Sequence, residues 1–100
     1  MAEIIWTEPA LQSLDEVADF IALDNPQAAQ GLVCKVFQQV DLLSQKPRMG
    51  NIPTELRGTP YRRLVISPIY LYYRVEGSRI IIIFADRTER EFDLLRLTLP

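Results

Sequence analysis

Histidine is missing from this chain of 100 residues. Its absence excludes serine–histidine and cysteine–histidine catalytic pairs, the usual zinc sites and the commonest general base at neutral pH. Cys34 is the single cysteine, so no disulfide can form within the chain, which suits a reducing compartment. We interpret Cys34 as a helix residue packed as a small hydrophobe.

Long apolar runs are also absent. The longest, residues 80–85, is far too short to cross a bilayer, and the apolar residues 4–6 are followed at once by Thr7, Glu8 and Pro9, unlike a secretory signal. We therefore expect a cytoplasmic protein with no membrane contact. Apolar residues make up 48% of the chain and charged residues 24%, which favours one ordinary globular domain over residues 1–100.

Charge is divided unevenly along the chain, although the net charge is only −2. Residues 1–45 carry one base and seven acids, whereas residues 46–100 carry ten bases and six acids, and nine of those ten bases are arginine. Arginine suits bidentate contacts with carboxylate or phosphate. The second half of the chain is therefore the expected side for a partner.

A short strand and a first helix are predicted at the start of the chain. Residues 3–7 (EIIWT) are rich in β-formers, and Thr7 is a good N-cap that is followed by Glu8 and Pro9. The following apolar residues recur at helical spacing and predict an amphipathic helix of about 15 residues. The members of this stripe are Leu11, Leu14, Val17, Ala18 and Ile21.

A second helix is predicted after the sequence DNP at residues 24–26. Asn25 suits the N-cap, and Pro26 suits the first helical position. Its apolar side contains Ala29, Leu32, Val33, Val36, Val40 and Leu43. Two one-sided helices joined this tightly indicate an αα-hairpin that needs a shared core.

The remaining chain predicts a loop and three strands. Residues 44–60 contain three prolines and two glycines without periodicity, so we expect a surface loop that exposes Lys46, Arg48 and Arg57. Apolar-rich runs at residues 61–66, 69–75 and 79–85 are separated by turn residues, as in two β-hairpins. The middle run alternates, and the third does not, which indicates a central strand covered on both faces. Residues 88–97 return to a helical pattern.

The expected fold class is therefore α+β, in the order β-α-α-β-β-β: an N-terminal strand, then an αα-hairpin packed on an antiparallel sheet, plus a short C-terminal helix.

This ordered series resembles the RelE/ParE superfamily of bacterial type II toxins. The resemblance rests on NPQAA at the helical hairpin, KPRMGN in the loop, ELRGTPYRRLVI, YLYYRV and IIIIFADRTER. It covers nearly the whole chain, and NPQAA with the P..G spacing looks more like the ParE branch. The resemblance implies a growth-arresting toxin that a cognate antitoxin neutralises, with DNA gyrase as the target of ParE-like members. No cofactor is implied, and the sequence leaves open a dimer or a higher hetero-oligomer with the antitoxin.

Two alternatives remain open within this resemblance. The chain could be a ribosome-dependent mRNA endonuclease, as RelE-like members are, or an inactive member that only binds an antitoxin. If it cleaves RNA, Arg63, Arg87 and Lys46 are the candidate residues. RNA cleavage without a metal needs a base and an acid, yet no tyrosine or histidine follows Tyr73, and Phe92 and Leu94 lie where one is sought.

The candidate binding residues are mostly arginines of the second half. A late arginine of the first hairpin, which the cleaving branch carries, is replaced by Val65 and Ile66. We expect the antitoxin or target to contact Arg62, Arg63, Arg74, Arg87, Arg90, Tyr70 and Tyr72. Direct sequence-specific DNA binding is disfavoured by the net charge of −2.

Overall fold

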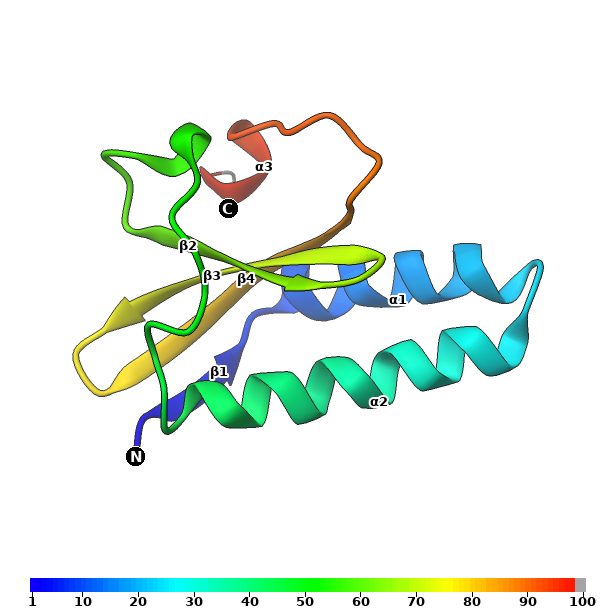
Figure 1. Cartoon of the computed structure of the whole chain (residues 1–100), viewed down its shortest axis with the longest axis horizontal. Coiled ribbons are helices and arrows are strands. Elements are labelled where there is room, and N and C mark those ends of the chain that lie inside the picture. The colour runs from blue at the N-terminus through cyan, green and yellow to red at the C-terminus, as the bar shows by residue number, and fades with distance from the viewer. Residues whose placement is uncertain (99–100) are drawn as a thin grey trace.

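The computed structural model describes residues 1–98, which form one four-stranded sheet and a long helical hairpin (Figure 1). The strands lie in the order β1-β4-β3-β2. The elements are β1 (Glu3–Trp6), α1 (Glu8–Ala22), α2 (Pro26–Leu43), β2 (Tyr61–Ile66), β3 (Ile69–Glu76), β4 (Arg79–Arg87) and α3 (Leu95–Thr98). The predicted α+β order is therefore confirmed.

Thr7 is the N-cap of α1, as the sequence predicted. Its Oγ1 accepts a hydrogen bond from the Ala10 N–H at 3.2 Å and donates one to the Ile82 carbonyl at 2.7 Å. The same side chain thus satisfies one of the free N–H groups at the helix start and ties that start to β4.

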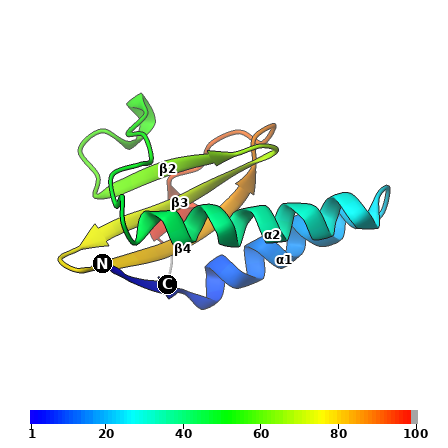
Figure 2. The same ribbon diagram turned by 60° about the horizontal axis from the view of Figure 1, so that its bottom comes forward.

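Asn25 is the N-cap of α2, also as predicted, and its Oδ1 accepts a hydrogen bond from the Ala28 N–H at 3.0 Å. The two helices form the expected hairpin, and both cover the same face of the sheet (Figures 1 and 2). The buried side of α2 consists of Ala29, Leu32, Val36, Val40 and Leu43, whereas Val33 is half-buried. Cys34 lies on the exposed side, so the prediction that it packs as a buried hydrophobe was wrong.

The buried stripe of α1 differs from the predicted one by a rotation of the helix. Leu11 is 43% exposed, while Ala10 and Ser13 are buried beside Leu14 and Val17. Small side chains at positions 10 and 13 allow the helix to approach β4 closely, and the Ser13 hydroxyl finds a backbone partner there. A hydrophobicity pattern alone favours leucine over alanine and serine at the core, which is why Leu11 was misplaced.

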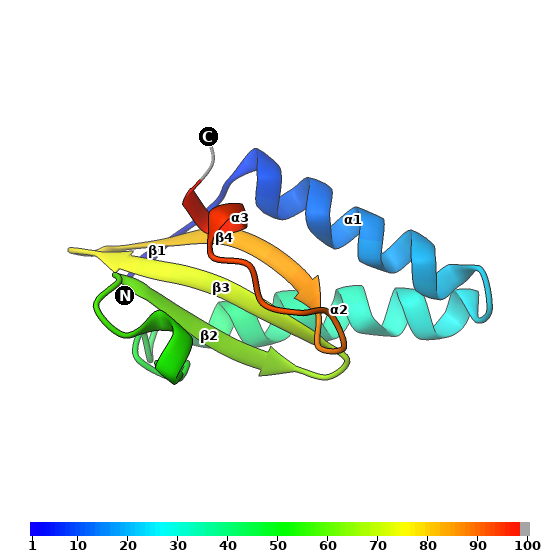
Figure 3. The same ribbon diagram turned by 90° about the horizontal axis from the view of Figure 1, so that it is seen from above.

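The sheet is mixed, whereas an antiparallel one was predicted. The pairs β2–β3 and β3–β4 are antiparallel, and β1 pairs with β4 in parallel. The helical hairpin, the loop after it and the two β-hairpins each turn the chain back, so β4 runs in the direction of β1 again (Figure 3).

The predicted alternation of β3 is confirmed. Ile69, Leu71, Tyr73 and Val75 belong to the core beneath the helices, while Tyr70 and Tyr72 belong to a second cluster on the other face. The pairing with β4 shifts between Tyr72 and Tyr73, which marks a bulge in β4.

β4 is covered on both faces, as expected for a central strand. Ile80, Ile82 and Ala85 face the helices. Ile83 and Phe84 join the second cluster, which also contains Leu56, Tyr61, Tyr72, Phe92 and Leu97.

The C-terminal helix predicted over residues 88–97 was wrong over most of that range. A turn follows β4, with the Arg90 N–H donating to the Arg87 carbonyl, and only the single turn α3 is helical. Phe92 lies across the sheet instead, 5.7 Å from the Tyr72 ring centroid. Asp93 Oδ1 then accepts from the Leu95 N–H and starts α3.

Residues 44–60 form the predicted loop, which contains one short 3-10 turn at Thr54–Leu56. Lys46, Arg48 and Arg57 are exposed there, as expected. Among residues 1–98, no helix has the length and apolar character that a membrane span requires.

Candidate functional site: a groove between α1 and β4

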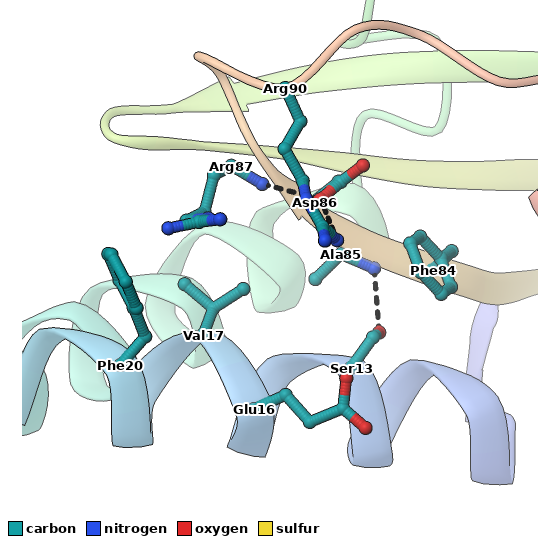
Figure 4. A pocket seen from close by; sticks show the side chains of 9 residues that line it. All are labelled: Ser13, Glu16, Val17, Phe20, Phe84, Ala85, Asp86, Arg87 and Arg90. Atoms are coloured by element: carbon teal, nitrogen blue, oxygen red, sulfur yellow. Dashed lines mark hydrogen bonds and ion pairs between the residues drawn. The ribbon is translucent and has the colours of Figure 1, made fainter.

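A hollow of about 170 Å³ lies between α1 and the end of β4 (Figure 4). A second hollow, which shares Ser13, Glu16 and Phe84 with the first, continues it toward Pro9 and Gln12. We call the two together the α1–β4 groove. The first hollow is lined by Ser13, Glu16, Val17, Phe20, Phe84, Ala85, Asp86, Arg87 and Arg90.

One wall of the groove is a single face of α1, because its residues repeat at intervals of three and four positions. These residues are Pro9, Gln12, Ser13, Glu16, Val17 and Phe20. With a rise of 1.5 Å per residue, this wall is about 16 Å long. Val17 and Ala85 are buried and form the apolar floor. The groove is therefore an elongated hollow along α1 with an apolar floor.

Ser13 fixes the distance between the two walls. Its hydroxyl accepts a hydrogen bond from the Ala85 N–H at 2.9 Å and donates one to the Ala10 carbonyl at 3.0 Å. The pairing of β4 with β1 ends at Ile82, so Ala85 has no β1 residue beside it on that edge. Ser13 thus satisfies an edge N–H beyond the end of β1 (Figure 4).

Arg87 stands at the end of β4 and stacks on Phe20. Its guanidinium carbon lies 3.9 Å from the ring centroid, and its Nη1 pairs with Glu89 at 3.2 Å. The side chain remains 24% exposed, while Phe20 is 51% exposed. Stacking on an aromatic face orients the planar guanidinium, and its edge contacts the carboxylate of Glu89, which is 64% exposed.

Arg90 and Asp86 line the groove on the same side as Arg87. Asp86 is 8% exposed, its Oδ1 accepts from the Arg87 N–H at 2.9 Å, and it lies 3.6 Å from Arg90 Nη1. Glu16 lines the opposite wall. The wall from β4 and the turn after it therefore carries two arginines, each paired with a carboxylate, and α1 contributes the carboxylate of Glu16, above an apolar floor.

Two polar groups of the groove already have partners within the chain. The hydroxyl in the groove, that of Ser13, is occupied by two backbone groups, and Asp86 is held by Arg90 and a backbone N–H. Within residues 1–98, no group of three or more acidic or cysteine side chains could hold a metal ion.

Arg63, Tyr70 and Tyr72 lie together on the other face of the sheet. The Arg63 guanidinium is 4.0 Å from the Tyr70 ring centroid and pairs with Glu55 at 3.7 Å. Tyr72 is buried, and this burial raises the pKa of its hydroxyl, an effect that a hydrogen bond from Arg63 partly offsets. Phe92 packs on Tyr72, so a partner reaches this ring only by displacing that segment.

The other predicted residues are placed elsewhere. Arg62 points to the face opposite Arg63, where its Nη1 donates to the Gly50 carbonyl at 2.9 Å. Arg74 pairs with Glu76, which also pairs with Arg79, at the end of the sheet away from Arg87. The structure therefore joins Arg87 with Arg90 in one site and separates both from Arg62, Arg63 and Arg74.

Sequence reasoning missed Phe20, Ser13 and Glu16 as groove residues. Phe20 is an aromatic residue off the predicted apolar stripe of its helix, and that position was the available signal. Ser13 carried no signal, because its partner Ala85 is 72 residues away in the chain.

The α+β fold agrees with the resemblance to small toxins of the RelE/ParE superfamily, and a family match supports the same class of protein. Residues 4–91 match the ParE toxin of the type II toxin-antitoxin system, parDE, and the chain belongs to this family.

Relatives agree with this assignment. Toxin RelE2 of Caulobacter vibrioides is 33% identical over 79 residues, which cover 77% of this chain and 85% of that protein. Putative toxin Y4kP of Sinorhizobium fredii is 36% identical over 74 residues, covering 72% and 74% of the two chains. A solved structure of the chromosomal ParDE TA system from P. aeruginosa matches 87% of this chain and 96% of that chain, with 28% identity and a TM-score of 0.71.

Proposed function

We propose that this ParE-family toxin arrests growth by binding DNA gyrase and inhibiting it, and that a cognate antitoxin neutralises it. The observation that carries the proposal is the Arg87–Phe20 stack at the mouth of the α1–β4 groove. A half-exposed aromatic ring beside an oriented arginine is a typical centre of a protein–protein contact.

Binding rather than cleavage accounts for the groups that the molecule offers. Tyr61, Tyr72 and Tyr73 are buried, and burial raises the pKa of the Tyr72 and Tyr73 hydroxyls, which makes them poor bases at neutral pH. Val65, where the cleaving branch carries an arginine, is 52% exposed and offers no charge to a phosphate.

Neutralisation by an antitoxin is supported by the family and by the charges of the groove. An amphipathic segment fits this groove when an acidic residue takes the place of the exposed Glu89 on Arg87 and an apolar residue covers Val17. Such a segment covers the Arg87–Phe20 stack and prevents a second protein from using it.

The test is inhibition of purified gyrase by the purified toxin. We expect the toxin to block supercoiling and to trap cleaved DNA, and we expect Arg87→Ala and Phe20→Ala each to weaken inhibition at least about tenfold, as loss of a central interface contact does. Arg79→Ala is the matched control, because Arg79 lies at the other end of β4 and is 51% exposed. Gyrase unaffected by the wild-type chain would refute the proposal.

Ribosome-dependent mRNA cleavage is the second candidate. It is favoured by the relative named Toxin RelE2 and by Arg63, whose Nε is buried with no hydrogen-bond partner beside Tyr70 and Tyr72. Cleavage of ribosome-bound message that is lost in Arg63→Ala and kept in Arg79→Ala would establish this function in place of gyrase inhibition.

A further inference from the structure

The loop of residues 44–60 is held in one shape by buried contacts. The Tyr73 hydroxyl accepts from the Gly50 N–H at 2.8 Å and donates to the Pro47 carbonyl at 2.9 Å. Asn51 and Arg63 exchange two backbone hydrogen bonds of 2.8 Å, and Leu56 is fully buried. The loop is therefore a fixed part of the surface, and its backbone loses little conformational entropy when a partner binds to its side chains.

Arg48 and Arg57 of this loop and Arg62 of the strand after it differ from the other arginines in their partners. Arg63, Arg74, Arg79, Arg87 and Arg90 each pair with a carboxylate. Among the described side chains, the arginines without a carboxylate in ion-pair distance are Arg48, Arg57 and Arg62. Unpaired positive charge is thus concentrated at this end of the sheet.

Arg48 and Arg62 share a hollow of about 290 Å³ that is separate from the α1–β4 groove. Arg62 is held in place by the Gly50 and Arg48 carbonyls, which do not neutralise its charge. Ile52, 48% exposed, lines the hollow beside Val75. A positive charge fixed next to an exposed aliphatic side chain favours a ligand with a carboxylate and an apolar group in neighbouring positions.

We propose that this hollow binds an acidic protein segment in which an Asp or Glu contacts Arg48 and Arg62 and an adjacent apolar side chain covers Ile52. Charge complementarity supports this occupant, because the loop's own carboxylate, Glu55, is already paired with Arg63. Arginine binds carboxylates with charge-assisted hydrogen bonds, which are the strong ones.

A nucleic acid fits the hollow less well. Single strands bind through stacking on exposed aromatic rings, but the aromatic residue here, Tyr61, is 9% exposed and its hydroxyl donates to the Leu97 carbonyl. The net charge of −2 also lacks the positive excess that drives binding to phosphates.

This surface goes beyond the proposed function, since it lies at the other end of the strands from Arg87. Tyr61 pairs with Arg74 near the hollow, whereas Arg87 pairs with Ile69 at the opposite end of β3. A partner in the α1–β4 groove therefore leaves the loop hollow open to an acidic segment.

The probe for the test is a fluorescein-labelled peptide of alternating glutamate and leucine, titrated with the purified chain and followed by anisotropy. We expect Arg48→Glu to weaken binding at least about tenfold, because it replaces a charge-assisted contact by repulsion. Ile52→Ser should weaken it by a smaller factor. Lys35→Glu changes the net charge equally on an exposed site of α2 and should leave binding nearly unchanged.

Three results would overturn the proposal. Equal binding by Arg48→Glu and the wild type would show that the hollow is not the site. An equal loss in Lys35→Glu would show a response to net charge alone. Tighter binding of a labelled single-stranded oligonucleotide through Arg48 would assign the hollow to a nucleic acid. Arg48 and Lys35 are exposed, and within residues 1–98 neither forms an ion pair, so both charge variants should keep the wild-type melting temperature.

Discussion

Tyr73 and Gly50 lie in direct contact, with the Tyr73 hydroxyl accepting a hydrogen bond of 2.8 Å from the Gly50 N–H. A Cβ atom at position 50 would lie 2.7 Å from both Cε1 and Oη of Tyr73 and 3.0 Å from the Arg63 carbonyl oxygen. The same hydroxyl donates to Pro47. One buried tyrosine thus explains the glycine of the P..G spacing, because it leaves no room for a side chain at position 50, whereas the carbonyl that it uses at position 47 is one that any residue supplies.

Gly50→Ala is expected to destabilise the protein by about 1–3 kcal/mol, because a well-packed site must shift to admit the methyl group. Gly31→Ala is the control, since Gly31 is exposed in α2 and a Cβ there meets nothing within 4 Å. That change should stabilise the protein by about 0.5–1 kcal/mol through helix propensity. Urea unfolding measures both, and changes of the same sign would contradict the account.

Tyr73→Phe should lower the free energy of unfolding by about 1–3 kcal/mol, because it leaves the buried Gly50 N–H without its partner. Burial raises the pKa of Tyr73 above its ordinary value of 10.0, and the Gly50 N–H and the Arg62 charge only partly offset this.

The sign of the pH effect follows from that raised pKa. As the pH rises past 10.0, the Tyr73 hydroxyl loses its proton in the unfolded chain before it does so in the native protein. The native state then binds more protons than the unfolded state, so the free energy of unfolding falls as the pH rises further. Tyr73→Phe should make this alkaline decline shallower, although Tyr72, whose pKa burial also raises, retains part of it. Unfolding curves across this pH range test the prediction, and an unchanged slope would refute it.

Ser13→Ala should destabilise the protein by about 1–3 kcal/mol, because the buried Ala85 N–H then has no acceptor. Ser78→Ala, at an exposed turn position, should change the stability by less than about 0.5 kcal/mol. Hydrogen exchange at the Ala85 amide offers a direct readout, and the exchange rate should rise in the Ser13 variant. Full protection of that amide in Ser13→Ala would contradict the assignment.

Thr7→Ala should cost more than Asn25→Ala, although both residues are N-caps. Asn25 makes one capping bond, which is typically worth about 1 kcal/mol. Thr7 makes a capping bond and also donates to the Ile82 carbonyl, which adds about 1 kcal/mol. Thermal unfolding of the two variants compares them, and an equal loss would show that the bond to β4 contributes nothing.

Local rules predicted most of the fold. Thr7, Asn25 and Pro26 marked the helix starts, and the alternation from Ile69 to Val75 gave the two faces of β3, because caps and strand periodicity depend on near neighbours. The rotation of α1 and the path of residues 88–94 were not predictable in this way. Both depend on tertiary contacts, namely Ser13 with Ala85 and Phe92 with Tyr72.

The site was predictable only in part. Arg87 and Arg90 were expected to contact a partner, which stays a prediction, and the structure places them on one wall of a groove. Which arginines keep an unpaired charge depends on distances between strands and turns, and a sequence does not show them. Arg48 thus looked like Arg74 in the sequence, yet Arg74 pairs with Glu76 and Arg48 has no carboxylate partner among the described residues.

The parallel pairing of β1 with β4 joins residues near the start of the chain to residues near its end, as the bond between Thr7 and Ile82 shows. During synthesis, β1 therefore has no strand to pair with until β4 has left the ribosome. Loop closure over so long a span makes this pairing a late event in folding. A chain that ends before Arg79 lacks both β4 and Arg87, so a prematurely terminated copy of this toxin cannot assemble the groove.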